Sequence, residues 1–276
     1  MSTRDTTWPA GTPCWVDLAV PDVPKAVEFY SGVIGWSLVD SGEEFGHYHI
    51  AQVEGHAAAG VGPTMAEGQP SFWTLYIASD DTDATAKLIT ENGGNVVMEA
   101  MDVPGAGRMC IAADPTGAVF GVWQSLGMPG AGIVNEPGGI AWEDARLTDV
   151  EAGRAFYTAV FGWTYAEIPG VELSEYGTFH GGGDPLGGLG GMMGAPNGSV
   201  TNAMRPYGVS IGGCMTPPPS RSTAATAAST SAVPKYTSQC DGVPSGAPIM
   251  PPRPPSGSPP PWNVPYSDSS TPGISA

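Results

Sequence analysis

The sequence has few basic residues for its size. Its 276 residues include 10 lysines and arginines but 27 aspartates and glutamates, so its formal net charge is −17. Such an acidic surface would repel nucleic acid and anionic membranes, and we expect neither as a partner. The sequence also lacks a run of about 18 apolar residues, which a transmembrane helix would require.

Export signals and paired cysteines are missing as well. Residues 1–10 lack the apolar core of a secretory signal peptide. The four cysteines, which are Cys14, Cys110, Cys214 and Cys240, show neither CxxC spacing nor the spacing of a metal site. We therefore expect reduced thiols and a cytoplasmic location.

The composition changes abruptly near Pro196. Residues 196–276 contain no leucine, phenylalanine, glutamate or histidine, yet they hold 17 of the 29 prolines. This composition cannot bury enough apolar surface to become ordered. Two interpretations remain open: a disordered Pro/Ser/Gly-rich C-terminal tail, or a reading-frame slip near Pro196, which the abrupt loss of residue types favours.

A segment near the N-terminus occurs twice. Residues 14–36 return, changed but without gaps, as residues 141–163. The matching positions are Trp15 with Trp142, Asp22 with Asp149, Phe29-Tyr30 with Phe156-Tyr157, and Gly35-Trp36 with Gly162-Trp163. A match over a whole strand–turn–helix unit indicates an internal duplication.

The repeated segment predicts a strand followed by a helix. Apolar residues alternate with other residues over 15–20, which is typical of a half-buried strand. Asp22 suits a helix N-cap, and Gly35 suits the end of that helix. Three strand-like segments follow, so each unit reads β-α-β-β-β, and the fold class is α+β.

These units define the expected domains. Residues 13–125 form a first domain of two units, residues 126–139 a Gly/Pro-rich linker, and residues 140–195 one further unit. Residues 196–276 stand where a fourth unit is expected. The missing unit makes a homodimer an alternative to a monomer.

Two motifs carry a family resemblance: the pattern Asp22…Phe29-Tyr30…Gly35-Trp36, and the stretch from Gly107-Arg108 through Asp114-Pro-Thr-Gly117 to Gln124. Together they resemble the vicinal oxygen chelate superfamily of glyoxalases, bleomycin-resistance proteins and extradiol dioxygenases. The resemblance covers residues 13–194, and it is to the two-domain actinobacterial type, which includes proteins of anthracycline pathways. It implies a cup-shaped mixed sheet with helices outside and a cavity on the concave face.

Enzymes of this superfamily hold a divalent metal in that cavity. Carried over by the resemblance, the ligand positions fall on Trp15, Thr74, Gly121 and Trp142. None of these supplies a carboxylate, imidazole or amide donor, so we expect no metal cofactor. His47 and His49, two apart on an expected strand, are the alternative metal ligands, although surface histidines would show the same spacing.

Aromatic residues are the strongest candidates for ligand binding. Strand alternation places Trp15, Tyr76 and Trp123 on the concave face, where they suit a planar aromatic ligand or else simply fill the cup. Asp17 shares this face and is the candidate catalytic base, because burial raises a carboxyl pKa; pairing with Arg108 or Arg146 is the competing interpretation. The expected ligand-binding set is Trp15, Asp17, Tyr76, Arg108, Trp123 and Trp142.

Three functional hypotheses follow. The first is a metal-independent protein that binds a hydrophobic aromatic small molecule, as an accessory or resistance factor in antibiotic biosynthesis. The second is a lyase, isomerase or oxygenase, hydroxylase-like or glyoxalase-like, that needs a divalent metal or an aspartate base. The third is a product without function, if residues 196–276 leave the second domain incomplete.

Overall fold

The structure is a computed structural model, and it describes residues 3–168, 170, 176–182, 189–194 and 203–206. Module 1 comprises β1 (Pro13–Val20), α1 (Val23–Val33), β2 (Ser37–Asp40), the short 3-10 helix η1 (Glu43–Phe45), β3 (His49–Val53) and β4 (His56–Pro63). Module 2 comprises β5 (Phe72–Ala78), α2 (Thr82–Glu91), β6 (Asn95–Val103), β7 (Gly107–Ala113) and β8 (Val119–Ser125). Module 3 comprises β9 (Glu143–Leu147), α3 (Val150–Phe161), β10 (Thr164–Glu167), β11 (Gly177–His180) and β12 (Leu189–Gly194), and β13 (Ala203–Pro206) follows it.

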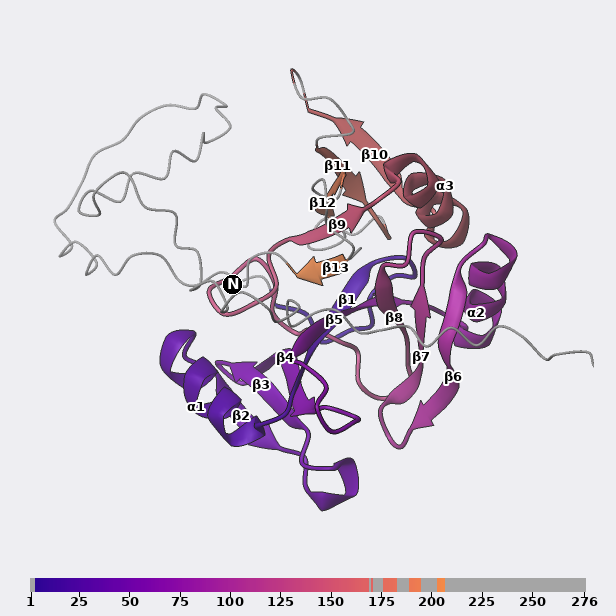
Figure 1. The fold of residues 1–276 in the computed structure, drawn as a ribbon. Coiled ribbons are helices and arrows are strands. Elements are labelled where there is room, and N and C mark those ends of the chain that lie inside the picture. Colours follow the sequence, from indigo (N-terminus) through magenta and orange to yellow (C-terminus); the bar gives the residue numbers. More distant parts are fainter. Residues whose placement is uncertain (1–2, 169, 171–175, 183–188, 195–202, 207–276) are drawn as a thin grey trace, which may run out of the picture. The chain divides into compact units, whose positions relative to one another are not determined.

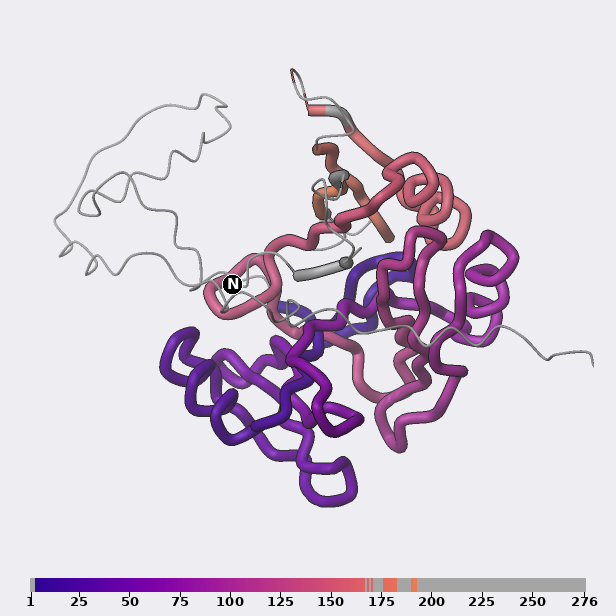
Figure 2. Tube along the Cα trace, viewed as in Figure 1, coloured from indigo at the N-terminus to yellow at the C-terminus, as the bar shows by residue number. Residues whose placement is uncertain are grey.

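Two mixed sheets contain the described strands (Figure 1). The first has the order β2-β3-β4-β1-β5-β8-β7-β6, with β1 parallel to β4 and antiparallel to β5. The second has the order β10-β11-β12-β9-β13 and repeats the first five positions of the first sheet. The predicted α+β fold built from β-α-β-β-β modules is thereby confirmed. The trace in Figure 2 follows the chain from module 1 in indigo to module 2 in magenta.

Strand β13 holds the position in the second sheet that β5, the first strand of module 2, holds in the first sheet. It pairs antiparallel with β9, just as β5 pairs antiparallel with β1. This strand falls within the stretch that the composition assigned to a tail or to a frame slip. The remainder of that stretch, residues 196–202 and 207–276, lies outside the described residues, so neither interpretation is tested there.

Each helix begins at an aspartate. The carboxylates of Asp22, Asp81 and Asp149 accept hydrogen bonds from backbone amides three residues ahead, at 3.1, 3.0 and 2.9 Å. These bonds satisfy amide groups that the first helical turn would otherwise leave without partners. None of the helices in the described part of the chain is long and apolar enough to cross a membrane.

The three α-helices of the described residues cover one face of their sheets. Helix α1 packs on β2 and β4, α2 on β6, β7 and β8, and α3 on β9 and β12 (Figure 1). The strands point their fully buried aliphatic and aromatic side chains toward this side, namely Val16, Leu75, Ile77, Phe120 and Val122. We call the opposite face of each sheet its inner face, because alternation along a strand places the intervening residues there.

Module 3 packs on module 2 through α3. The rings of Phe156 and Phe120 meet edge-on at 6.1 Å, and both are buried. The buried hydroxyl of Tyr157 donates a 3.0 Å hydrogen bond to Asp114 Oδ2. Asp114 Oδ1 accepts hydrogen bonds from the backbone amides of Thr116 and Ala118. The Asp114 carboxylate therefore binds both its own turn and helix α3.

Replacing Tyr157 with phenylalanine tests how much this contact contributes. We expect Tyr157→Phe to lower the free energy of unfolding by about 2 kcal/mol, because a buried carboxylate loses a donor. Urea denaturation measures the change. The matched control is Tyr30→Phe, because Tyr30 is the duplicate of Tyr157 on α1 and is half-buried. This change should lower the free energy of unfolding by less than about 1 kcal/mol. Equal costs for the two variants would contradict the assignment.

Candidate functional site

Aromatic and acidic side chains share the inner face of the first sheet. Trp15 lies opposite Tyr76 in the register of β1 and β5, and Asp17 lies two residues further along β1. Trp123 pairs with Ala78 two positions after Tyr76, so it shares the same face. Trp15, Tyr76 and Trp123 are only 5%, 6% and 8% exposed. The predicted grouping of these four residues on one face agrees with the register of the strands.

A hydrogen-bonded triad lies at the centre of this face. The indole Nε1 of Trp15 donates to Asp17 Oδ1 at 2.7 Å and to the Tyr48 hydroxyl at 3.0 Å. The Tyr48 hydroxyl in turn donates to Asp17 Oδ1. A Cβ at Gly60 of β4 would overlap both the Tyr48 hydroxyl and the Asp17 carboxylate, so only glycine leaves room for the triad there. We call Trp15, Asp17 and Tyr48 the first clamp.

The second sheet repeats the clamp. Trp142 Nε1 donates to Asp144 Oδ1 and to the Tyr176 hydroxyl, each at 3.0 Å, and that hydroxyl donates to Asp144 Oδ1 at 3.2 Å. Gly191 of β12 leaves room for it, because a Cβ there would overlap Tyr176 and Asp144. The duplication has therefore preserved a complete polar arrangement, the second clamp, as well as the fold.

Neither Tyr48 nor Tyr176 was among the residues predicted for the site. Tyr48 precedes β3 and Tyr176 precedes β11, so neither belongs to a strand whose alternation could orient it. Two signals in the sequence could have indicated these tyrosines. Tyr48 and Tyr176 follow their paired tryptophans by 33 and 34 residues, and β4 and β12 each contain a glycine beside the tyrosine. A glycine on a buried strand often marks the close approach of another group, which is the case here.

Burial governs the ionisation of the first clamp. It raises the pKa of the Asp17 carboxyl above its ordinary value, against the opposing effect of hydrogen bonds from Tyr48, Tyr76 and Trp15. Burial, reinforced by the negative charge of Asp17, also raises the pKa of Tyr48 and of Tyr76 well above the ordinary value. The direction predicted for Asp17 is confirmed, and the two phenols remain hydrogen-bond donors across the physiological range.

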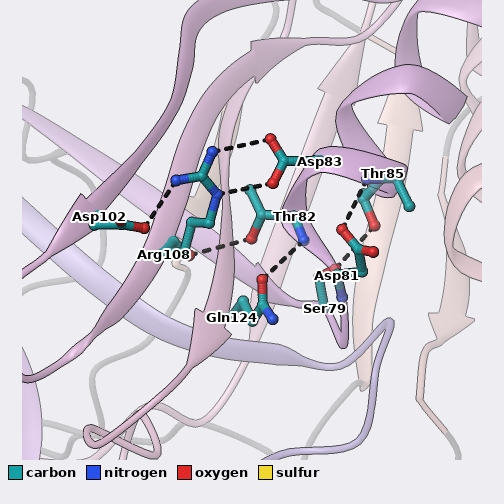
Figure 3. Close-up of polar contacts among 9 residues, drawn as sticks. Ser79, Asp81, Thr82, Asp83, Thr85, Asp102, Arg108 and Gln124 are labelled. Atoms are coloured by element: carbon teal, nitrogen blue, oxygen red, sulfur yellow. Dashed lines mark hydrogen bonds and ion pairs between the residues drawn. The ribbon is translucent and has the colours of Figure 1, made fainter.

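Arg108 does not join this group. Its Nε and Nη2 contact both carboxylate oxygens of Asp83 on α2, at 2.8 and 2.9 Å, and its Nη1 contacts Asp102 at 2.8 Å (Figure 3). Arg108 lies two residues before the buried Cys110 on β7, so both side chains point to the face that carries the helices. The structure therefore places Arg108 on the side opposite Trp15, where it ties α2 to the sheet and does not pair with Asp17.

The Nδ1 atoms of the two histidines make separate contacts, and His47 lies outside strand β3. His47 has a left-handed backbone with φ of 58°, and its exposed ring lies 2.9 Å from Asp40 Oδ2. The Nδ1 of His49 contacts the backbone oxygen of His47 at 2.7 Å. Across the described residues, no group of three or more histidine, cysteine, aspartate or glutamate side chains is arranged to hold a metal ion.

The residues at the superfamily's metal positions do not fit a divalent cation. Trp15 and Trp142 offer an N–H donor, which faces a carboxylate in each clamp. The ring of Tyr76 lies across Gly121, so that a Cβ there would overlap it. Divalent metals need carboxylate, imidazole, thiolate or carbonyl donors, and these positions have none on their side chains.

One small cavity adjoins the predicted set. It has a volume of about 130 Å³ and is lined in part by Trp8, Ser79, Trp123 and Gln124. Typical small-molecule pockets measure roughly 300–1,000 Å³, so this cavity would accept only a fragment of a polycyclic ligand.

Comparison with known proteins identifies the family. The sequence model of the Glyoxalase/Bleomycin resistance protein/Dioxygenase superfamily matches residues 14–122. The protein CFP32 of Mycobacterium tuberculosis is 37% identical over 194 residues, which cover 68% of this chain and 74% of that protein. The anthracycline biosynthesis protein DnrV of Streptomyces peucetius is 35% identical over 212 residues, covering 71% of this chain and 74% of that protein. The chain therefore belongs to this superfamily.

Solved structures share the fold. The Mn(II)-bound glyoxalase from Novosphingobium aromaticivorans has a TM-score of 0.52 at 15% identity, covering 68% of this chain and 63% of that one. A mutant of 4-hydroxymandelate synthase from Streptomyces coelicolor has a TM-score of 0.50 at 14% identity, covering 70% and 66%. This chain thus spans slightly less than two thirds of each of these structures, and at such identity the likeness concerns the fold alone.

The glycine beneath the first clamp provides one test. We expect Gly60→Ala to lower the free energy of unfolding by roughly 1–3 kcal/mol, because the added methyl displaces Tyr48 from Asp17. The control is Gly32→Ala in α1, where a Cβ would meet nothing within 4 Å. That change should stabilise by roughly 0.5–1 kcal/mol, since alanine favours helix. Urea denaturation would contradict this account if Gly60→Ala were neutral.

Glu143, beside the second clamp, makes stability depend on pH. Burial, reinforced by the neighbouring charge of Asp144, raises the pKa of Glu143 from 4.5 to about 8. A raised carboxyl pKa favours the folded state below pH 4.5, and this contribution is lost as pH rises through about 8. The shift corresponds to at most roughly 4–5 kcal/mol.

We therefore expect Glu143→Gln to flatten the fall in unfolding free energy between pH 5 and pH 9, as urea denaturation at several pH values would show. The exposed Glu28 of α1 offers the matched control, Glu28→Gln, which should leave the slope as in the wild type. An unchanged slope in Glu143→Gln would show that Glu143 is not the responsible group.

Proposed function

We propose that this chain is a metal-independent small-molecule-binding member of its superfamily that holds a hydrophobic aromatic ligand. The observation that carries the proposal is the replacement, in both domains, of metal-ligand positions by tryptophans engaged in clamps. Tryptophan and tyrosine offer flat apolar area and stacking that suit a planar ring system. The proposed binding residues are Trp15, Tyr76 and Trp123, with Trp142 in the second sheet; among these four, Trp123 lines the small cavity described above.

The relatives suggest the biological setting of this binding. DnrV and DauV, which are 35% and 37% identical to this chain, are both named as anthracycline biosynthesis proteins. These names support an accessory or resistance role toward a planar aromatic polyketide as part of the proposal. The free, buried thiols of Cys14 and Cys110 suit a reducing cytoplasm.

A second candidate function rests on Asp17. Its carboxylate touches the Tyr48 hydroxyl, and its raised pKa brings it toward the range of a general base. In this alternative, Asp17 accepts a proton from a bound substrate, while Trp15 and Tyr48 hold the carboxylate in place. An isomerase would then return this proton to another atom of the substrate, and a lyase would expel a leaving group from the deprotonated substrate. Turnover that Asp17→Asn abolishes, with ligand affinity kept, would favour the enzyme.

Ligand binding can be measured by quenching of tryptophan fluorescence with an uncharged dihydroxyanthraquinone. We expect saturable quenching that dialysis against EDTA leaves unchanged. Trp15→Phe should weaken binding about tenfold, as expected for the loss of a central anchor contact. Trp36→Phe is the control, because the Trp36 indole donates to the backbone oxygen of Gly138 on the helix side. Stoichiometric metal in the purified protein, or unaltered affinity in Trp15→Phe, would remove the proposal.

A further inference from the structure

Part of the inner face of module 2 is apolar and accessible. Met109 lies opposite Trp123 in the register of β7 and β8, so its side chain shares the inner face with that ring. Ile111 lies opposite Gly121, two residues further along β7, and therefore faces the same way. Met109 and Ile111 are both partly exposed, whereas Trp123 is only 8% exposed. The accessible side chains beside the buried aromatic rings are thus aliphatic and sulfur-containing.

The edge strand β6 adds two methionines to this group. Met98 pairs with Ile111 and Met101 pairs with Met109, so an advance of three residues along β6 matches an advance of two along β7. The irregularity between the two pairs is a bulge, and it turns both methionines to the inner face although their numbers differ by three. Met98 is partly exposed, and Met101 is 47% exposed. We call Met98, Met101, Met109 and Ile111 the methionine surface.

Two glycines direct aromatic rings toward the methionine surface. A Cβ at Gly121 of β8 would overlap the Tyr76 ring, and a Cβ at Gly107 of β7 would overlap the Trp123 ring. Each ring therefore extends across the neighbouring strand, in the direction of β6. Trp123 Nε1 donates a 3.0 Å hydrogen bond to the backbone oxygen of Met128, which holds the indole in this orientation. The methionine surface is thus continuous with the proposed binding residues Tyr76 and Trp123.

The chemistry of the methionine surface narrows the kind of molecule that it fits. None of its four side chains carries a charge, in a chain whose net charge is −17. The charged residues nearest to it in the strand register, Asp102 and Arg108, pair with each other on the face that carries the helices. A charged group brought onto the methionine surface would lose water without gaining a partner, which is costly. The surface therefore favours an uncharged molecule.

The size of the surface argues against a protein partner. With the rings of Tyr76 and Trp123 it spans the four strands β5, β8, β7 and β6 and two rows of residues, roughly 14 Å by 7 Å. Adding the next row, in which Val119 pairs with Ala113, gives an area of about 200 Å². A stable protein–protein interface buries about 800 Å² on each partner. An area of this size instead matches one face of a small planar molecule.

We propose that the methionine surface holds the ring system of an uncharged planar aromatic ligand. This inference rests on the proposed function and adds the residues that select among ligands. A thioether sulfur makes favourable contacts with aromatic rings, and the unbranched methionine side chain adapts to ring systems of different outline. The site should therefore tolerate different neutral substituents on the rings and discriminate against charged ones.

Oxidation of methionine by dilute hydrogen peroxide tests the proposal on the full-length protein, with peptide mass spectrometry as the readout. Saturating dihydroxyanthraquinone should slow sulfoxide formation at Met101 about fivefold, because oxidation follows the exposure of the sulfur and the bound rings cover it. Met65, which is 83% exposed and lies between β4 and β5, should oxidise at the same rate with and without the ligand.

The outcomes separate this inference from the proposed function. Unchanged oxidation of Met101 at a ligand concentration that saturates the tryptophan quenching would overturn the inference and leave the proposed function standing. Absence of saturable quenching would remove the proposed function, and the inference with it. Protection of Met101 that appears without ligand and grows with protein concentration would assign the surface to a second copy of the chain, which also overturns the inference.

A substitution gives a second readout. Met101→Gln keeps the length of the side chain but replaces its sulfur and methyl group by an amide, and it should weaken binding of dihydroxyanthraquinone about fivefold. Met65→Gln is the matched control and should bind as the wild type does, because Met65 lies outside the methionine surface. Equal affinities of the two variants, measured by tryptophan quenching, would contradict the assignment of Met101.

Discussion

The inner face of each sheet depends on the need to satisfy a buried carboxylate. Asp17 and Asp144 lie among aromatic rings, where an unpaired charge would cost several kcal/mol. In each sheet an indole N–H and a phenol O–H are turned onto the same carboxylate oxygen. Those donors in turn require glycine at Gly60 and Gly191, because any side chain would occupy the position of the tyrosine hydroxyl. In each sheet one buried carboxyl group thus constrains the residue types on two strands and at the tyrosine that precedes a third.

The duplication shows which features of the module are local and which depend on its neighbours. The N-cap aspartates, the strand order and the clamps recur, because each is satisfied within one module or one sheet. The surroundings of α1 and α3 differ, because they depend on what another module brings. Tyr157 donates a hydrogen bond to Asp114 and Phe156 packs on Phe120, both of module 2, whereas Phe29 is exposed. Identical sequence elements therefore acquire different energetic roles.

Much of the fold could be predicted from the sequence, because the signals for it are local. Alternation along β1 placed Trp15 and Asp17 on one face, and the repeat fixed the order of elements in module 3. The predicted placement of Arg108 near Asp17 was wrong. On β7, Arg108, Cys110 and Ala112 are two residues apart and therefore share the face that carries the helices. Tyr48 could not be placed, because it lies outside the regular strands and its position depends on a gap left by Gly60, a residue from another strand.

The clamps also constrain what chemistry the inner face can perform. A metal site requires lone pairs directed at one point, whereas each clamp directs two protons at one carboxylate oxygen. Converting one arrangement into the other would require replacement of the tryptophan and release of the tyrosine, which are mutually bonded. The superfamily fold is thus retained with an inner face that carries aromatic rings around a hydrogen-bonded carboxyl group in each sheet.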